Sequence, residues 1–322
     1  MNILIYIFIF LLCIVLYIHI IYHLQTSSDD NVYEIDYTNK QNLEKVCNLR
    51  QPFSFKFPHK NNLSRENILS KNEQINIIKT EEHNNNTKED NNDTKEDNND
   101  TKEDNNDTKE DNNDTKEDNN DTKEDNNDTK EDNNDTKEGN NDTKIYSEYN
   151  NKLITNTDII KEIQMYDNFI CPEYTVKNTY DIILSDENFK TPMISNYNFR
   201  NYYIINEGTI KIRFVSPLYN EFITFDKDYE LLQNVATINI WDETNPNIKF
   251  TEITFNKGDI IYIPPQWWFS ICIVEPAIVS KYNYRSIMNI TTYLSYYVYS
   301  FISITKSYDE NIKENTLKLK SN

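Results

Sequence analysis

The sequence predicts a mainly β domain, a sandwich or barrel with flanking helices, behind an N-terminal membrane-spanning helix. Three observations predict it: many short apolar segments separated by turns, a long apolar run at the N-terminus, and a low-complexity tract that interrupts the foldable part. The 322-residue chain has 53 acidic and 33 basic residues, a net charge of −20. Because a nucleic-acid backbone is bound by a basic face, we expect no nucleic-acid partner.

The N-terminal run from Ile3 to Tyr22 contains no Lys, Arg, Asp or Glu. A helix of that length spans the hydrocarbon core of a bilayer, which is about 30 Å thick. No basic residue precedes the run and no small-residue cleavage site follows it, which favours an uncleaved single-pass anchor over a signal peptide. We therefore expect residues 1–24 to anchor the protein through 3–22. The first Lys or Arg is Lys40, so the charge rule does not decide the side of the membrane.

Residues 84–144 repeat the heptad NNDTKED. The unit contains no apolar residue, which excludes a coiled coil and predicts a disordered tract; the tail 307–322 is expected to be disordered too. The tract holds nine Lys against 23 acidic residues, so it carries −14 of the net charge and the rest of the chain only −6. Each copy also contains an Asn-x-Thr glycosylation acceptor, such as Asn92. The sequence leaves open whether these sites are modified or belong to a plain solvated spacer.

The foldable part reads mostly as strands. Helices are expected at Gln41–Cys47 and near Thr157–Met165. Strands are expected at Val32–Ile35, Pro52–Phe57, Tyr202–Ile205, Ile210–Val215, Ala236–Trp241, Phe250–Phe255, Ile260–Ile263, Ser270–Val274 and Ile278–Tyr284. Two of the three glycines, Gly208 and Gly258, lie between such strands, where we expect them to supply the positive φ of tight hairpin turns.

The segment Gly258–Phe269 (GDIIYIPPQWWF) resembles a signature of the cupin-like JmjC family, written Gly-Asp, four apolar residues, Pro-x-x-Trp-Trp-His. Two further pieces fit that family in the same order: Asn201–Tyr203 followed by Gly208, and Ile240–Asp242 ahead of the Gly-Asp strand. The order of the two pieces along the chain supports the resemblance.

This resemblance covers about residues 145–290 and implies a double-stranded β-helix barrel. It implies a cupin-like domain over 145–306 that ends in a C-terminal helix, with residues 25–83 leading into the same domain ahead of the repeat. Similar membrane-anchored versions occur in large DNA viruses.

Active members of the family bind Fe(II) through His-x-Asp and a distal His, and they leave coordination sites free for 2-oxoglutarate and oxygen. Counting from the resemblance, the three ligands fall on Ser195, Tyr197 and Phe269, and the basic anchor for 2-oxoglutarate falls on Ile210. A hydroxyl, a phenol with a pKa of about 10 and a phenyl ring cannot replace two imidazoles and a carboxylate. No histidine follows His83, so we expect no bound metal and no cofactor in the barrel.

Other residues are expected at the cavity or mouth of the barrel. They are Asn201, Ile210, Trp267, Trp268 and Asn283. The two tryptophans fit core and rim packing better than a ligand platform. The apolar C-terminal stretch Ile287–Ile304 could pack on the barrel, form a homodimer interface, or cross the membrane a second time; its polar residues disfavour the span.

Two functions follow from this reading. The first is a non-catalytic, membrane-anchored pseudoenzyme that binds a protein or small ligand or scaffolds an assembly. The alternative is an Fe(II)/2-oxoglutarate-dependent oxygenase, a JmjC-type hydroxylase or demethylase. Only the resemblance of fold supports the alternative, and fold does not imply function.

Overall fold

The computed structural model describes residues 3–27, 29–36, 39–58, 63–70, 75, 77–81, 144–242 and 245–302. All of them belong to one compact unit, 1–81 with 143–322, and everything below concerns that unit. The predicted disordered tract 84–144, apart from Lys144, and the predicted disordered tail 307–322 lie outside the described residues.

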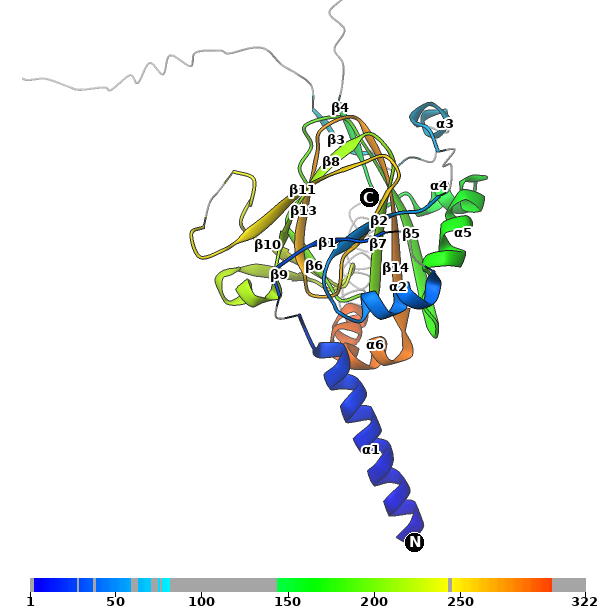
Figure 1. The fold of residues 1–322 in the computed structure, drawn as a ribbon, viewed down its shortest axis with the longest axis vertical. Coiled ribbons are helices and arrows are strands. Elements are labelled where there is room, and N and C mark those ends of the chain that lie inside the picture. Colours follow the sequence, from blue (N-terminus) through cyan, green and yellow to red (C-terminus); the bar gives the residue numbers. More distant parts are fainter. Residues whose placement is uncertain are drawn as a thin grey trace, which may run out of the picture. The chain divides into compact units, whose positions relative to one another are not determined.

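Two facing β-sheets form the body of the unit (Figure 1). Sheet A has the strand order β1-β2-β12-β7-β14-β5-β4-β3, and sheet B has the order β11-β8-β13-β6-β10-β9. The strands of sheet A are β1 (Tyr33–Glu34), β2 (Phe53–Lys56), β3 (Ile77–Glu81), β4 (Lys144–Ser147), β5 (Thr175–Ser185), β7 (Arg200–Glu207), β12 (Asp259–Tyr262) and β14 (Ala277–Ser286). Those of sheet B are β6 (Ile194–Asn196), β8 (Thr209–Val215), β9 (Phe225–Asp228), β10 (Gln233–Ala236), β11 (Phe250–Asn256) and β13 (Trp268–Ile273).

Gly208 and Gly258 stand at one corner of the barrel. β7 continues into β8 and β11 into β12, but each pair passes from one sheet to the other, so neither glycine closes a hairpin as expected from the sequence. Both have positive φ, +81° and +93°, as predicted. The two glycines therefore bend a two-stranded antiparallel ribbon between the sheets.

Within the described residues, helices and one 3-10 turn flank the sheets. They are α1 (Ile3–Leu24), α2 (Lys40–Cys47), α3 (Arg65–Leu69), α4 (Asn151–Thr155), α5 (Ile159–Ile170), α6 (Ile287–Thr292) and the 3-10 turn η2 (Pro217–Phe222). Residues 294–302 are again helical after a turn at Tyr293. Helices α2, α4 and α5 bury apolar side chains such as Leu43 and Ile163 against the outer face of sheet A. Side-chain caps fix two helix starts, since Asn39 accepts from Asn42 N–H and Ser286 from Asn289 N–H.

Three apolar clusters make the core. One lies between α2, α4, α5 and sheet A, a second lies between the two sheets, and a third covers the outer side of sheet B around Trp268. We call the space between the sheets the lumen. The second cluster, with Ile210, Ile212 and Phe214 from β8, fills much of it.

The mainly β barrel with flanking helices and an apolar N-terminal helix is as predicted. The predicted strand Ala236–Trp241 is wrong, because β10 ends at Ala236 and bends and turns follow. The long strand β5 was missed because its first half, Thr175 to Asn178, is largely exposed and polar. A strand with no apolar alternation leaves no signal in the sequence.

Candidate functional site

One end of the lumen is polar, and β14 makes it so. Side chains alternate across a strand, so Lys281, Asn283 and Arg285 face the lumen while Tyr282 and Tyr284 pack against the helices. Across the sheet, Lys281 lies opposite Asp181 of β5 and Tyr203 of β7. The register of these three strands therefore places charged and hydroxyl groups inside the barrel.

A pocket of about 190 Å³ opens at this polar end. Its lining comes from β5, β6, β10, β14 and the loops beside them. The residues are Tyr149, Asn151, Lys177, Thr179, Tyr180, Asp181, Asn196, Asn198, Glu230, Leu231, Gln233, Lys281, Asn283 and Arg285. A smaller space of about 40 Å³ continues inward to Tyr203, Ile194 and Phe269. The polar pocket thus leads toward the position that the family uses for its metal.

Lys281 is charged although it is nearly buried. Desolvation opposes its charge, but the carboxylates around it, those of Glu148 and Asp181, favour the charged form, and the pKa of Lys281 is raised. Lys281 Nζ lies 3.4 Å from Glu148 Oε1. Burial raises the pKa of Asp181 against the effect of Lys281, and its carboxylate accepts the backbone N–H groups of Tyr149 and Asn150.

Two polar atoms at the polar end of the lumen lack a partner among the described residues. One is the hydroxyl of Tyr203, a residue that is 1% exposed and lines the 40 Å³ space, and the other is Oδ1 of Asn283 at the 190 Å³ pocket. Burial raises the pKa of Tyr203 to about 12, so the phenol is protonated and can donate. Its neighbour Tyr202 faces the helices, where its hydroxyl lies 3.1 Å from Cys47 Sγ. An unsatisfied buried polar group is costly, so this pair of atoms marks a place for a ligand or water.

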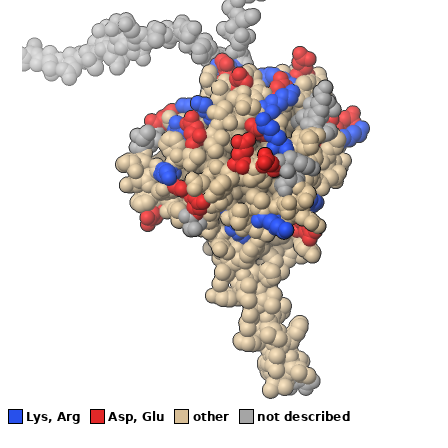
Figure 2. All heavy atoms as spheres, in the orientation of Figure 1, with Lys and Arg blue, Asp and Glu red and all other residues tan. Residues whose placement is uncertain are grey.

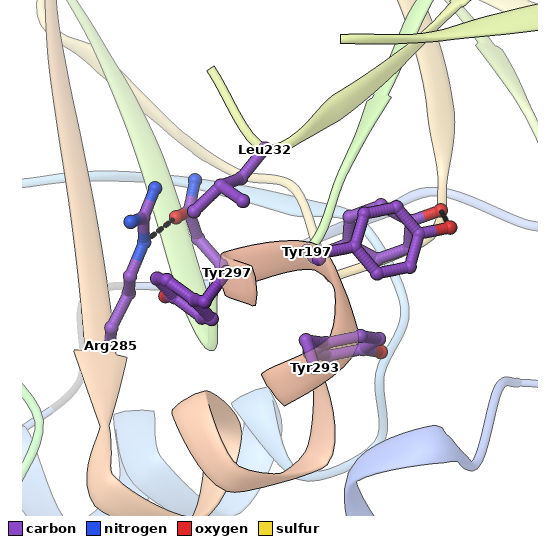
Figure 3. A pocket seen from close by; sticks show the side chains of 7 residues that line it. Tyr197, Leu232, Arg285, Tyr293 and Tyr297 are labelled. Carbon is purple, nitrogen blue, oxygen red and sulfur yellow. Dashed lines mark hydrogen bonds between the residues drawn. The ribbon is translucent and has the colours of Figure 1, made fainter. Parts of the chain in front are cut away.

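Arg285 adds positive charge at the pocket mouth. Its Nε donates to Asn198 Oδ1 at 2.6 Å, and its guanidinium lies 5.7 Å from the centroid of the Tyr297 ring (Figure 3). No carboxylate of the described residues pairs with it within ion-pair distance. Lys281 is paired with Glu148, and the lining also holds the carboxylates of Asp181 and Glu230. Arg285, which pairs with no carboxylate of the described residues, is therefore the lining group placed to take an anionic group.

The three expected metal positions do not converge. In the pairing of β6 with β13, Phe269 lies opposite Ile194, and Trp268 lies opposite Ser195. Directly opposed residues share a face, so Phe269 and Ile194 point into the lumen, whereas Ser195 points outward with Trp268. Tyr197 follows β6 and bonds to Asn234, the partner of Ser195 on β10, on the outer side.

The inward positions of β6 are therefore Ile194 and Asn196, one residue before those counted from the sequence. With Phe269 they offer two hydrocarbon side chains and one neutral amide. Fe(II) in this family is held by two imidazoles and a carboxylate, so these residues do not fit the ion. Within the described ranges, no three His, Cys, Asp or Glu side chains gather as a metal site would require.

Tyr197 belongs to a cluster of tyrosines beneath the C-terminal helical stretch (Figure 3). Its hydroxyl lies 2.7 Å from that of Tyr296, and its ring centroid is 4.7 Å from that of Tyr293. Burial raises the pKa of Tyr197. These rings fill the space beside Arg285, so Tyr197 serves packing.

Apart from Asn283, the expected mouth residues are buried away from the pocket. Ile210 and Trp267 belong to the lumen cluster, and the Trp267 indole donates to the carbonyl of Arg50 at 3.1 Å. Trp268 lies on the outer side of sheet B. Asn201 is fully buried and donates to the carbonyl of Ile263. Among the expected mouth residues, Asn283 alone lines the 190 Å³ pocket.

Sequence reasoning missed Lys281, Tyr203 and Arg285 as site residues. The alternation Lys281-Tyr282-Asn283-Tyr284-Arg285 was the available signal. By itself this alternation indicates a strand with one solvent-exposed face and one buried face. Only the register of β14 with its neighbours shows that the polar face points into the barrel.

The two sheets face each other, and antiparallel strand pairs pass from one sheet to the other around the lumen. This arrangement is a double-stranded β-helix. A family model described as a cupin-like domain matches residues 27–290, and the chain belongs to this family. No curated protein matches the chain.

Proposed function

We propose that this protein is a membrane-anchored binding module whose cupin-like barrel holds a small anionic molecule without iron. One observation carries the proposal: the polar end of the lumen keeps Lys281, Arg285 and the unpaired atoms of Tyr203 and Asn283, while Phe269 occupies the distal metal position of the family signature.

The pocket limits the size of the ligand. A volume of about 190 Å³ equals roughly six water molecules at about 30 Å³ each, so the ligand is a small molecule. A carboxylate suits the guanidinium of Arg285, because a planar fork of N–H groups binds carboxylates in pairs. A donor group on the ligand would reach Asn283 Oδ1, and an acceptor that extends into the inner 40 Å³ space would take the Tyr203 hydroxyl.

The iron-dependent oxygenase remains the alternative function. It requires a donor set that Ile194, Asn196 and Phe269 do not supply, and it requires a basic anchor where Ile210 is packed among aliphatic side chains. No observation at the site favours it over metal-free binding.

The membrane anchor is the second part of the proposal. Helix α1 is 22 residues long and apolar enough to cross a membrane, and at 1.5 Å per residue it is about 33 Å long. Charged side chains are spread over the barrel in Figure 2, and the protruding helix carries none. Leaving this apolar surface in water is unfavourable, so we place α1 in a bilayer.

Native mass spectrometry of the detergent-solubilised full chain tests the binding function. We expect a small-molecule adduct, retained from the expression host or added from a panel of small carboxylates. Asn283→Leu replaces the unpaired amide of the lining with an apolar group of similar size and should abolish the adduct. Asn178→Leu, on the exposed part of β5, is the matched control and should retain it.

Two results would overturn the proposal. One is the absence of any adduct across the panel in a folded wild-type protein. The other is an adduct that Asn283→Leu and Asn178→Leu leave unchanged, because the ligand would then lie outside the pocket.

A further inference from the structure

The C-terminal helical stretch presents an apolar face to its surroundings. Residues 294–302 form a helix on which Leu294, Val298 and Phe301 are 55%, 49% and 68% exposed. A spacing of three to four residues places them on one stripe. No Lys, Arg, Asp or Glu occurs between Ile287 and Ile304. A soluble surface helix normally carries charge on its outer face, so this stripe needs a partner.

The barrel holds this helix so that the stripe stays outward. Tyr293 accepts a hydrogen bond from the side chain of Gln266 at 2.9 Å, and the Tyr296 hydroxyl lies 2.7 Å from that of Tyr197. Lys227 lies 5.2 Å from the centroid of the Tyr296 ring. The inner face is thus engaged, and the helix cannot turn to bury Leu294 and Val298 in its own domain.

The same side of the domain receives the membrane helix. Helix α1 contacts α6 and leaves the domain beside it (Figure 1). Arg50 fastens the last turn of α1, because its Nη1 donates to the carbonyls of His23 and Gln25 at 3.1 Å each. The Tyr22 hydroxyl donates to Asn48 Oδ1 at 3.0 Å. These bonds fix the end of α1 next to the C-terminal stretch.

We propose that the exposed stripe of residues 294–302, with Ile287, lies in the interfacial layer of the bilayer that α1 crosses. This inference rests on the anchor part of the proposed function. An apolar face flanked by tyrosines and without charge suits the depth where head groups meet acyl chains. The domain would then contact the membrane through both α1 and the helical stretch 294–302, instead of through α1 alone.

A second copy of the chain fits the stripe less well. Nine helical residues are about 14 Å long and one helix about 10 Å wide. Such an area is far below the ~800 Å² per partner of a stable interface. A bilayer sets no such lower limit, because α1 already holds the domain at its surface.

The pocket lies close to this face. Asn198 and Arg285 line both the space beneath the helical stretch and the 190 Å³ pocket. Seating the stripe in the interface would therefore set the mouth of the pocket near the membrane surface.

Spin labels on two matched valines test the inference in the full chain, reconstituted in phosphatidylcholine vesicles. Val298→Cys reports on the stripe. Val274→Cys is the control, because Val274 is 38% exposed in the turn before β14, at the opposite end of that strand from α6. For these two samples Cys13, Cys171 and Cys272 are replaced by alanine. Cys47 stays, since it is buried and burial raises its pKa to about 11. A third sample carries the label on native Cys13 within α1, with Cys171 and Cys272 replaced by alanine.

Collision of each label with oxygen and with a water-soluble nickel chelate gives its depth in the bilayer. We expect the labels at 13 and 298 to favour oxygen several-fold over the chelate, and the label at 274 to favour the chelate. Leu294→Cys repeats the measurement should the Val298 variant fail to fold, as judged by circular dichroism.

The outcomes separate the two proposals. A label at 13 in the bilayer with a label at 298 open to the chelate overturns the docking surface and leaves the anchor intact. A label at 13 in water overturns both. Dipolar broadening between labels at 298 of two copies, with exclusion of oxygen and chelate alike, assigns the stripe to a homodimer and overturns the lipid surface.

Discussion

The two ends of the lumen differ although the same strand lines both. At its start, β14 points Ala277 and Val279 inward, among isoleucines of β7 and β8. At its end it points Lys281, Asn283 and Arg285 inward, around a pocket. Packing stabilises the first end, and paired charges and hydrogen bonds occupy the second.

This difference shows that a lumen without a fitting set of metal ligands among its described residues can still have a polar pocket. Phe269 and Ile194 lie at the border between the two ends and extend the apolar packing over the place of a metal. Beyond that border the interior stays polar. A barrel that kept only its fold would gain stability from apolar residues there too, because buried polar groups are costly unless bonded.

The largest expected effect comes from the polar end. Lys281→Met leaves the buried carboxylates of Glu148 and Asp181 without their cation, which should lower the free energy of unfolding by about 3–5 kcal/mol. The loss should shrink as the pH is lowered, because burial already raises the pKa of Asp181 and protonation removes its charge. Urea unfolding of the detergent-solubilised chain measures it.

Lys211→Met is the control for this variant. Lys211 pairs with Glu252 on the outer face of sheet B and its side chain is 41% exposed, so its loss should cost less than about 1 kcal/mol. Equal losses in the two variants would show that Lys281 is not in a buried charge cluster.

At the apolar end, replacing the corner glycines Gly208 and Gly258 by alanine should lower the stability of the barrel by different amounts. At Gly208 an added Cβ would lie 2.2 Å from the carbonyl oxygen of Pro276, whereas at Gly258 it would meet nothing within 4 Å. Gly258→Ala bears only the cost of a positive φ, about 1–2 kcal/mol. Gly208→Ala adds overpacking and should cost at least about 3 kcal/mol in all. Thermal unfolding of both variants gives the order, and a reversed order would refute the corner geometry.

The smallest expected change in stability comes from removing the hydroxyl of Tyr203 or of Tyr202, adjacent residues that lie on opposite faces of β7. Tyr203→Phe removes an unpaired hydroxyl and should leave stability unchanged or raise it by up to about 1 kcal/mol. Tyr202→Phe removes a hydroxyl bonded to Cys47 and should lower stability by about 1 kcal/mol. Urea midpoints of the two variants test the sign. A loss at Tyr203 equal to that at Tyr202 would mean that its hydroxyl is satisfied and marks no ligand position.

The sequence predicted the barrel well where its signals were local. The Gly-Asp strand with its two tryptophans and the positive φ of Gly208 and Gly258 are short-range features. The partners of those strands are not local, so two corners were mistaken for hairpins.

The site was harder to predict because it depends on register. β6 has three residues, and counting back from Asn201 selected Ser195, whereas pairing with β13 turns Ile194 inward. A shift of one residue exchanges the two faces of a strand. Lys281 was missed for a similar reason, since nothing near it in the sequence shows that Asp181 and Tyr203 lie opposite it.

The central claim is that the barrel keeps a pocket and holds no iron. Anaerobic equilibrium dialysis of the full chain against Fe(II) and 2-oxoglutarate, followed by metal analysis, tests it most directly. We predict an iron content far below one atom per chain, the same in wild type and Asn283→Leu. One iron atom retained per chain in the wild type would contradict the claim and favour the alternative function, an iron-dependent oxygenase.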